Sequence, residues 1–270
     1  MAQGGLRRDS KIAHREEIAD VRGTKIRMMR GGSGPALLYL HGAGGSGVWL
    51  PFFEELAKDF TVLVPTHPGF AGSEGYDNID SIHDLVFHYI DLMNELGLDR
   101  APIAGSSLGG WLAAEIAVHH PERVGKLVLI DACGLHVEGT MIADFFAPSP
   151  PELRKLVFHD PESELAKTAV PDAPSPEQLD AILRARQTAA RIGWNPFMYD
   201  PKLRSRLYRI KAPTLIIWGE DDRLVPIEHG KAYHEGIAGS RLVTIEKSGH
   251  VPIVENPART AQAIREFIRS

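Results

Sequence analysis

Residues 102–111 read PIAGSSLGGW, a short apolar run followed by two adjacent serines between glycines. Where a strand turns directly into a helix, the bend is so sharp that only small residues fit two positions before and two positions after its tip. Centring the bend on Ser107 places Gly105 and Gly109 at these positions, whereas centring it on the preceding serine places a leucine there. The spacing therefore selects Ser107 as an exposed nucleophile, with a glycine-rich turn and an idle serine as the alternative interpretation.

Apolar runs of strand length recur along the chain and alternate with longer segments of helical pattern, which predicts a mostly parallel sheet covered by helices on both faces. The runs cover residues 36–42, 61–69, 100–107, 126–132, 213–220 and 241–250, and residues 25–34 are expected to add an antiparallel strand and turn. The helical segments are 48–59, 81–97, 108–124 and 256–270. In the last of these, Asn256 is expected to cap the helix and Pro257 to occupy its first turn.

Residues 134–209 interrupt this alternation. They are rich in proline and contain helical patterns, but they contain no convincing buried strand. Segments of this length inside one domain are usually functional, and a lid is the common case. We therefore expect a core formed by residues 1–133 and 210–270, with residues 134–209 as a helical lid.

The composition limits the classes of partner. The formal net charge is −5, so neither a nucleic acid nor an anionic membrane surface has electrostatic support, and no apolar run approaches the length of a membrane span. The single cysteine, Cys133, cannot form an internal disulfide, and the charged amino terminus lacks the apolar core of a secretory signal. We expect a cytoplasmic protein that acts on a small molecule, and the sequence leaves open whether it forms a homo-oligomer.

A serine nucleophile needs a base and a group that orients the base. His250 follows the last strand-like run, and Asp221 and Asp222 follow the run before it. The carboxyl ends of parallel strands meet at one edge of the sheet, so these residues are expected to converge on Ser107. Four other histidines occupy helical positions and are expected to be solvated or packed: His83, His88, His119 and His120.

From about residue 25 to its end, the chain resembles the α/β-hydrolase superfamily in five motifs, taken together and in order. These are LHGAGGSGVW, PTHPGFAGSE, AGSSLGGW, WGEDDRLVP and SGHVPIVENP. The resemblance implies an α/β-hydrolase fold with a lid, and a triad of Ser107, His250 and Asp222. Asp222 is preferred to Asp221 because meta-cleavage-product hydrolases with a similar segment use the aspartate directly before the arginine.

The same resemblance implies an oxyanion hole and a pocket. The backbone amides of Ala43 and Leu108 would bind the oxyanion, although Gly44 could shift the register by one residue, and His41 would brace the loop. Preorganised backbone donors of this kind are what a tetrahedral intermediate needs. The residues expected to line the substrate pocket are Gly42, Gly44, Trp49, Ser106 and Val251.

No cofactor or metal is expected. The sequence has no zinc-protease or cysteine-cluster motif, and His229 and His234 are five residues apart, a spacing that does not align them on one helical face. The segment THPGFAGS departs from the frequent family pattern at Thr66 and His67, to which we assign a structural turn and no chemistry.

The favoured reaction is hydrolysis of a carboxylic ester or lactone through an acyl-enzyme. Haloalkane dehalogenases and epoxide hydrolases of this superfamily carry aspartate at the position of Ser107, and hydroxynitrile lyases carry lysine where this chain has Val251. Both classes are therefore disfavoured.

The first alternative is carbon–carbon bond hydrolysis of a vinylogous diketone produced by aromatic ring cleavage. In such enzymes a tryptophan commonly follows the catalytic histidine, and a lid arginine holds the substrate carboxylate. Val251 lacks the first feature, while Arg184, Arg186 and Arg191 are candidates for the second. A cofactor-independent oxygenase and a non-catalytic ligand-binding member of the fold are further alternatives.

Overall fold

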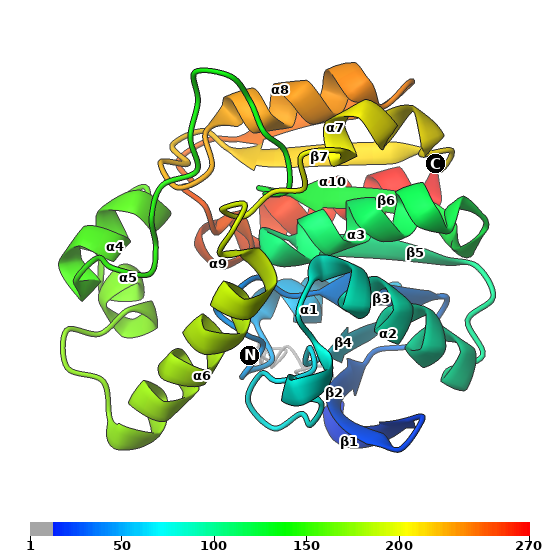
Figure 1. The fold of residues 1–270 in the computed structure, drawn as a ribbon, viewed down its shortest axis with the longest axis horizontal. Helices are drawn as coiled ribbons and strands as arrows, with labels where there is room; N and C mark the ends of the chain where they lie inside the picture. The colour runs from blue at the N-terminus through cyan, green and yellow to red at the C-terminus, as the bar shows by residue number, and fades with distance from the viewer. Residues whose placement is uncertain (1–12) are drawn as a thin grey trace, which may run out of the picture.

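The computed structural model describes residues 13–270, and its centre is one eight-stranded sheet (Figure 1). The strand order is β1-β2-β4-β3-β5-β6-β7-β8. β1 pairs with β2 and β2 with β4 in antiparallel fashion, and all the other pairs are parallel. The strands are β1 (His14–Val21), β2 (Thr24–Gly31), β3 (Ala36–Leu40), β4 (Thr61–Pro65), β5 (Ala101–Ser106), β6 (Val124–Ile130), β7 (Thr214–Gly219) and β8 (Arg241–Ile245). The predicted mostly parallel sheet is confirmed.

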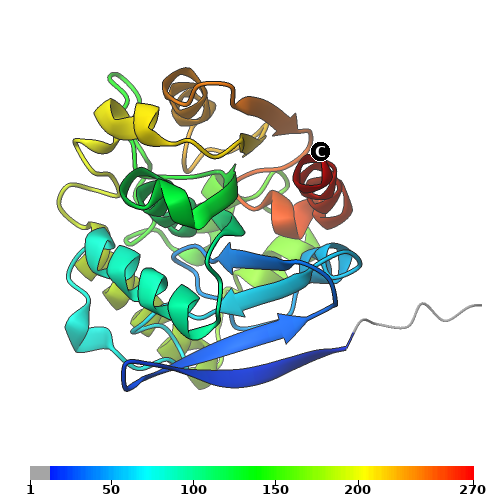
Figure 2. The ribbon, with the colours of Figure 1, turned by 90° about the vertical axis from the view of Figure 1, so that its right-hand side faces the viewer.

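Helices cover both faces of this sheet, which explains why the central strands are apolar without alternation. In Figure 2, α2 and α3 lie on one side and α1 and α10 on the other. The helices are α1 (Pro51–Leu56), α2 (Ile82–Glu95), α3 (Leu108–His119), α4 (Pro150–Val157), α5 (Glu164–Ala169), α6 (Pro176–Gly193), α7 (Leu203–Arg206), α8 (Ile227–Gly236), α9 (Pro252–Glu255) and α10 (Pro257–Arg269). Short 3₁₀ helices cover Tyr76–Asn78, Pro121–Arg123 and Leu207–Arg209.

The two faces of the sheet bury separate apolar clusters. The cluster under α2, α3 and α8 is the larger, and the other lies under α1, α9 and α10. α10 shows how the sequence specifies this layering: Ala261, Ile264 and Phe267 recur at helical spacing and are all buried. α2 is also fixed locally, because Ser81 and Asp84 form a reciprocal capping box at its start.

The segment 134–209 contains α4, α5 and α6, which lie beyond one end of the sheet (Figure 1). Contacts show that this is the carboxyl end of the parallel strands. The amide of Ala143 donates to the carbonyl of Leu224 after β7, and Thr188 Oγ1 donates to the carbonyl of Gly69 after β4. The large core cluster extends into this segment, since it includes Leu203 and Leu207 as well as Ala185, Ala189 and Ile192 of α6. We call α4, α5 and α6 the cap.

Two local expectations need correction. Residues 14–21 form the edge strand β1, which the sequence analysis did not identify; its side chains are mostly exposed, so it lacks an apolar run. Asn256 precedes α10, but its side chain makes no capping hydrogen bond there. Pro257 does begin α10 as expected.

No helix among residues 13–270 is long and apolar enough to cross a membrane. The amino-terminal stretch on which the expectation about a secretory signal rests lies partly outside the described residues.

Candidate active site

Ser107 occupies the turn between β5 and α3 in a strained backbone conformation, with φ 55° and ψ −117°. The glycines around it have no room for a side chain. A Cβ on Gly105 would lie 2.1 Å from the carbonyl oxygen of Gly109, and a Cβ on Gly109 would lie 2.1 Å from the carbonyl oxygen of Leu40. The steric argument made from the sequence therefore describes the turn correctly.

The structure brings Ser107, His250 and Asp222 into one hydrogen-bonded chain. The hydroxyl Oγ of Ser107 lies 2.9 Å from His250 Nε2, and His250 Nδ1 donates to Asp222 Oδ2 at 2.8 Å. The side chains of His250 and Asp222 are buried, and Ser107 is half-buried. This geometry orients an imidazole to accept the serine proton and a carboxylate to support the resulting positive charge.

The two adjacent aspartates differ in their hydrogen-bond partners. Asp222 Oδ1 accepts from the amides of Leu224 and Val225, both at 2.9 Å, so that Oδ2 is aimed at His250. Asp221 Oδ2 instead accepts from His159 Nδ1 at 2.5 Å, on the loop after α4. Asp221 thus connects the cap to the core.

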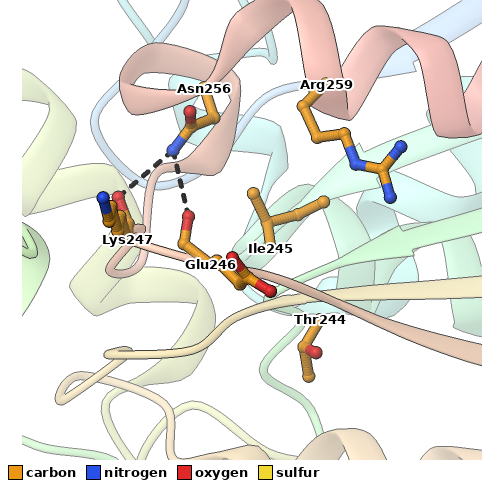
Figure 3. A pocket seen from close by; sticks show the side chains of 6 residues that line it. All are labelled: Thr244, Ile245, Glu246, Lys247, Asn256 and Arg259. Carbon is orange, nitrogen blue, oxygen red and sulfur yellow. Dashed lines mark hydrogen bonds between the residues drawn. The ribbon is translucent and has the colours of Figure 1, made fainter.

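Asn256 binds the loop that carries His250. Figure 3 shows this side chain at a pocket whose lining residues include none of the triad. Asn256 Nδ2 donates to the carbonyls of Glu246 and Lys247 and to Ser248 Oγ, at 3.2, 3.1 and 2.7 Å. The backbone of this loop makes a tight turn, since Lys247 has a φ of 52°. The side chain predicted to cap α10 therefore positions the loop that bears the base.

The cap contacts the same loop. The amide of His250 donates to the carbonyl of Val157 at 2.7 Å, and a Cβ on Gly249 would meet that carbonyl at 2.3 Å. Glu255 accepts from the amides of Gly249 and His159 and so joins the two segments. Burial raises the pKa of this carboxyl. The loop that carries His250 is thus held by the cap as well as by the sheet.

Asp131, at the end of β6, is a buried group that the sequence analysis missed. One of its carboxyl oxygens accepts from the amide of Gly219 at 2.7 Å, and the other has no partner among the described residues. Burial and the nearby charge of Asp222 raise the pKa of Asp131 well above its usual value. Burial and a neighbouring carboxylate both disfavour the charged form of Asp131.

The backbone amides of the two expected oxyanion donors have no hydrogen-bond acceptor among residues 13–270. The amide of Ala43 makes no hydrogen bond within the described part of the chain, and Leu108 is the first residue of α3, where the amide has no intrahelical acceptor. Gly42 lies beside the nucleophile: a Cβ there would be 3.8 Å from Ser107 Oγ. Gly44 is exposed, and Gly45 closes a turn onto the carbonyl of Gly42.

A buried network braces the loop of the expected oxyanion hole. His41 Nε2 accepts from the amide of His67, and His67 Nε2 donates to the carbonyl of His41, at 2.9 and 2.8 Å. Tyr89 donates to His67 Nδ1 at 2.6 Å. These bonds require both imidazoles to be neutral, and burial lowers the pKa of His41 to about 4 and that of His67 well below its usual value. The bracing role implied for His41 thus has a partner in His67.

Two residues expected in the pocket lie elsewhere. Trp49 stacks on His14 with ring centroids 4.8 Å apart and packs over Gly31, because the segment before α1 is directed toward β1 and β2. Ser106 Oγ shares a hydrogen bond of 2.7 Å with the hydroxyl of Tyr39 in the smaller core cluster. Ser106 is the last residue of β5 and Ser107 follows it in the turn, and their hydroxyls bond to different partners, Tyr39 and His250. Val251 is half-buried directly after His250.

The sheet order, the strained serine turn and the convergence of three side chains from the ends of β5, β7 and β8 define the protein as an α/β hydrolase. The comparisons agree. The profile of the alpha/beta hydrolase family matches residues 37–263, and the chain belongs to this family.

Individual relatives match over nearly the full length. The chain is 29% identical to a 2-hydroxy-6-oxo-6-phenylhexa-2,4-dienoate hydrolase of Comamonas testosteroni, covering 93% of this chain and 92% of the relative. It is 31% identical to a 2-hydroxy-6-oxononadienedioate/2-hydroxy-6-oxononatrienedioate hydrolase of Burkholderia vietnamiensis, covering 92% of each. The solved structure of the phenylhexadienoate hydrolase from Rhodococcus sp. strain RHA1 has the same fold, with a TM-score of 0.79 at 24% identity over 96% of this chain and all of that one. The chain is thus related to the meta-cleavage-product hydrolases.

Proposed function

We propose that this protein hydrolyses the carbon–carbon bond beside a ketone in a conjugated dienoate, with Ser107, His250 and Asp222 as the catalytic residues. The observation that carries the assignment of these three residues is the unbroken chain of 2.9 and 2.8 Å hydrogen bonds from the serine to the aspartate. The full-length similarity to two dienoate hydrolases supports the substrate class. The comparisons therefore favour the carbon–carbon alternative over the ester hydrolysis that the sequence analysis preferred.

In this mechanism Ser107 Oγ attacks the ketone carbon while His250 Nε2 takes the hydroxyl proton. The amides of Ala43 and Leu108 stabilise the oxyanion. As the oxyanion collapses, the carbon–carbon bond breaks, and its electron pair passes into the conjugated leaving group, which accepts the proton from His250. Water, activated by His250, then hydrolyses the acyl-serine and restores the free hydroxyl.

An aromatic cluster in and beside the cap supports a substrate with an apolar group. The rings of Phe145 and Phe146 are stacked with centroids 4.1 Å apart, and Phe146 contacts Trp194 and Phe197 at 5.5 and 5.9 Å. The bond from Ala143 to the loop after Asp222 holds this segment near the triad. We assign Phe145, Phe146 and Phe197 to the pocket for the acyl part of the substrate, whereas Trp194 is exposed at the rim of this cluster.

Ion pairs already engage two of the three arginines that are candidates for binding the dienoate carboxylate. Arg184 pairs with Asp180 on the exposed side of α6, and Arg191 pairs with Asp80. Arg186 is half-buried and has no ion pair among the described residues. Of the three arginines, Arg186 is therefore the one to test by substitution with glutamine.

Ester hydrolysis is the second candidate, favoured by Val251. The tryptophan that commonly follows the histidine in carbon–carbon hydrolases is replaced here by a smaller apolar side chain. The same triad and oxyanion donors serve both reactions, so the leaving group that the pocket accepts distinguishes the two.

The test is steady-state turnover of a phenyl-substituted 2-hydroxy-6-oxohexadienoate and of p-nitrophenyl esters from acetate to octanoate. We expect fast loss of the dienoate absorbance by the wild type and by Ser106→Ala, and almost none by Ser107→Ala. Fast ester turnover with an inert dienoate would replace the proposal with the esterase. Turnover of the dienoate that survives Ser107→Ala would refute the assigned nucleophile, and inertness toward both substrates would favour the oxygenase or the ligand-binding alternative.

A further inference from the structure

Three side chains outside the triad converge beneath a surface cavity of about 660 Å³. His83 comes from the first turn of α2, and Glu115 and His119 lie one turn apart on α3. Each offers one nitrogen or oxygen atom, and these atoms all lie within 4.8 Å of one another. From the sequence, the two histidines are expected to be solvated or packed. Their convergence could not be expected there, because only the tertiary fold brings α2 and α3 together.

Glu115 is the least expected member of the cluster. Its side chain is completely buried, yet its Oε2 has no hydrogen-bond partner among the described residues. The other oxygen, Oε1, accepts from Trp111 Nε1 at 3.0 Å, and this bond fixes the carboxylate so that Oε2 faces the histidines. Burial raises the pKa of this carboxyl to about 7, which reflects a charge without sufficient compensation. A buried carboxylate oxygen without a partner is costly, and a bound cation would supply the missing partner.

The spacing of the cluster suits a small transition-metal ion. His119 Nε2 lies 3.6 Å and His83 Nε2 lies 4.0 Å from Glu115 Oε2. With bonds of 2.0–2.2 Å, two ligands of a tetrahedral zinc ion are separated by about 3.4 Å. The separation of His119 from Glu115 is close to this value, and rotation of the two partly exposed imidazoles would shorten the other separations.

Asp200 approaches one of these three side chains. Asp200, in the segment that returns from the cap to the core, has its Oδ2 3.6 Å from His83 Nε2. Arg206 Nη1 lies 3.5 Å from the same oxygen, and this distance is at the limit for a hydrogen bond. Both histidines are about 40% exposed, so an ion can enter from the cavity without disturbing Glu115.

We infer that His83, Glu115, His119 and Asp200 form a binding site for a divalent transition-metal ion, with Zn²⁺ as the preferred occupant. Imidazole and carboxylate ligands are the donors that zinc takes in proteins. Trp111 would orient the ligand Glu115 by its hydrogen bond without contacting the ion, as the groups that hydrogen-bond to metal ligands commonly do. The site would connect α2, α3 and the segment after the cap, and it lies two helical turns from the start of α3, so it is structural rather than catalytic.

The first experiment strips the full-length protein of metal with a chelator and titrates it with Zn²⁺ by calorimetry, with elemental analysis of the washed complex. We expect one equivalent of Zn²⁺ per chain. Removing an outer partner of a metal site weakens affinity about 10–100-fold, so loss of a ligand in Glu115→Gln or in His119→Gln should cost at least about 100-fold. His120→Gln is the matched control, because His120 neighbours the site but pairs with Glu122.

The second experiment reads the ligand geometry directly. Co²⁺ should give the visible absorption of a tetrahedral site in the wild type and in His120→Gln, and this absorption should be lost in Glu115→Gln and in His83→Gln. His83→Gln changes an exposed side chain, so it keeps the test valid if the change at the buried Glu115 impairs folding. At Zn²⁺ concentrations 100-fold above the dissociation constant, the Tm should rise by roughly 5 °C.

Two results would overturn the inference. The first is a wild type that binds no equivalent of Zn²⁺ after removal of the chelator. The second is affinity that is unchanged in Glu115→Gln and His83→Gln, which would assign the bound metal to other surface histidines.

Discussion

Replacing Asp222 with asparagine should switch His250 to the tautomer that cannot accept the serine proton, while the size of the side chain hardly changes. In the native protein Asp222 Oδ1 accepts from the amides of Leu224 and Val225, so an acceptor is required at that position. The asparagine must therefore place its carbonyl there and its NH₂ group at the position of Oδ2, 2.8 Å from His250 Nδ1. An NH₂ group can only donate, and Nδ1 must then accept.

The consequence reaches Ser107 through the imidazole. With the proton moved from Nδ1 to Nε2, His250 presents a donor to Ser107 Oγ and cannot take its proton. The equivalent change in a serine–histidine–aspartate triad lowers kcat by about 10⁴-fold. That factor corresponds to about 5.4 kcal/mol of lost transition-state stabilisation. Because the side chain of residue 222 still accepts the hydrogen bonds from the amides of Leu224 and Val225, we expect the protein to remain folded.

The assay is steady-state kcat on the dienoate or on the best ester, with circular dichroism to confirm the fold. Asp221→Asn is the matched control, because Asp221 is about one-third exposed and bonds to His159 rather than to His250. We expect this control to keep activity within a few-fold of the wild type. Equal losses in the two variants, or a larger loss in Asp221→Asn, would refute the reasoning.

Three further predictions concern the support of the site. Ser106→Ala should keep most of the activity but cost about 1–3 kcal/mol in urea unfolding, because the hydroxyl of Tyr39 loses its buried partner; a 100-fold loss of kcat would contradict the assignment of Ser107. Gly109→Ala should fail to give folded protein, because the new Cβ would overlap a carbonyl of β3, whereas Gly47→Ala, with nothing within 4 Å, should fold normally; equal stability of the two would show that the elbow tolerates a side chain. The pKa of His41 is lowered to about 4 in the folded protein, so on acidification the unfolded chain takes up the proton first. The contribution of His41 to the free energy of unfolding should therefore be constant above pH 6.5 and fall by about 3 kcal/mol as the pH drops to 4. Urea midpoints that do not change between pH 6.5 and 4.5 would disprove this.

Features of the site that depend on residues close together in the sequence could be predicted, and features that depend on distant residues could not. The serine turn could be predicted because the clashes that exclude side chains at Gly105 and Gly109 involve the chain immediately around the bend and one neighbouring strand. The convergence of His250 and Asp222 on Ser107 followed from a general property of parallel sheets, whose strand ends meet at one edge. Other features depended on which way a side chain turns. Trp49 sits beside the correct loop in sequence, yet its ring packs over β1 and β2.

The sequence by itself determined the layered sheet, the strained turn at Ser107 and the order of the triad, because apolar periodicity and glycine spacing act over a few residues. Only the tertiary structure decided which groups meet from distant elements. Examples are the buried Asp131 beside Asp222, and Glu115, whose Oε2 has no hydrogen-bond partner among residues 13–270 and faces a histidine from another helix. Burial and proximity set the charge of such groups, and both properties arise only when the helices pack on the sheet.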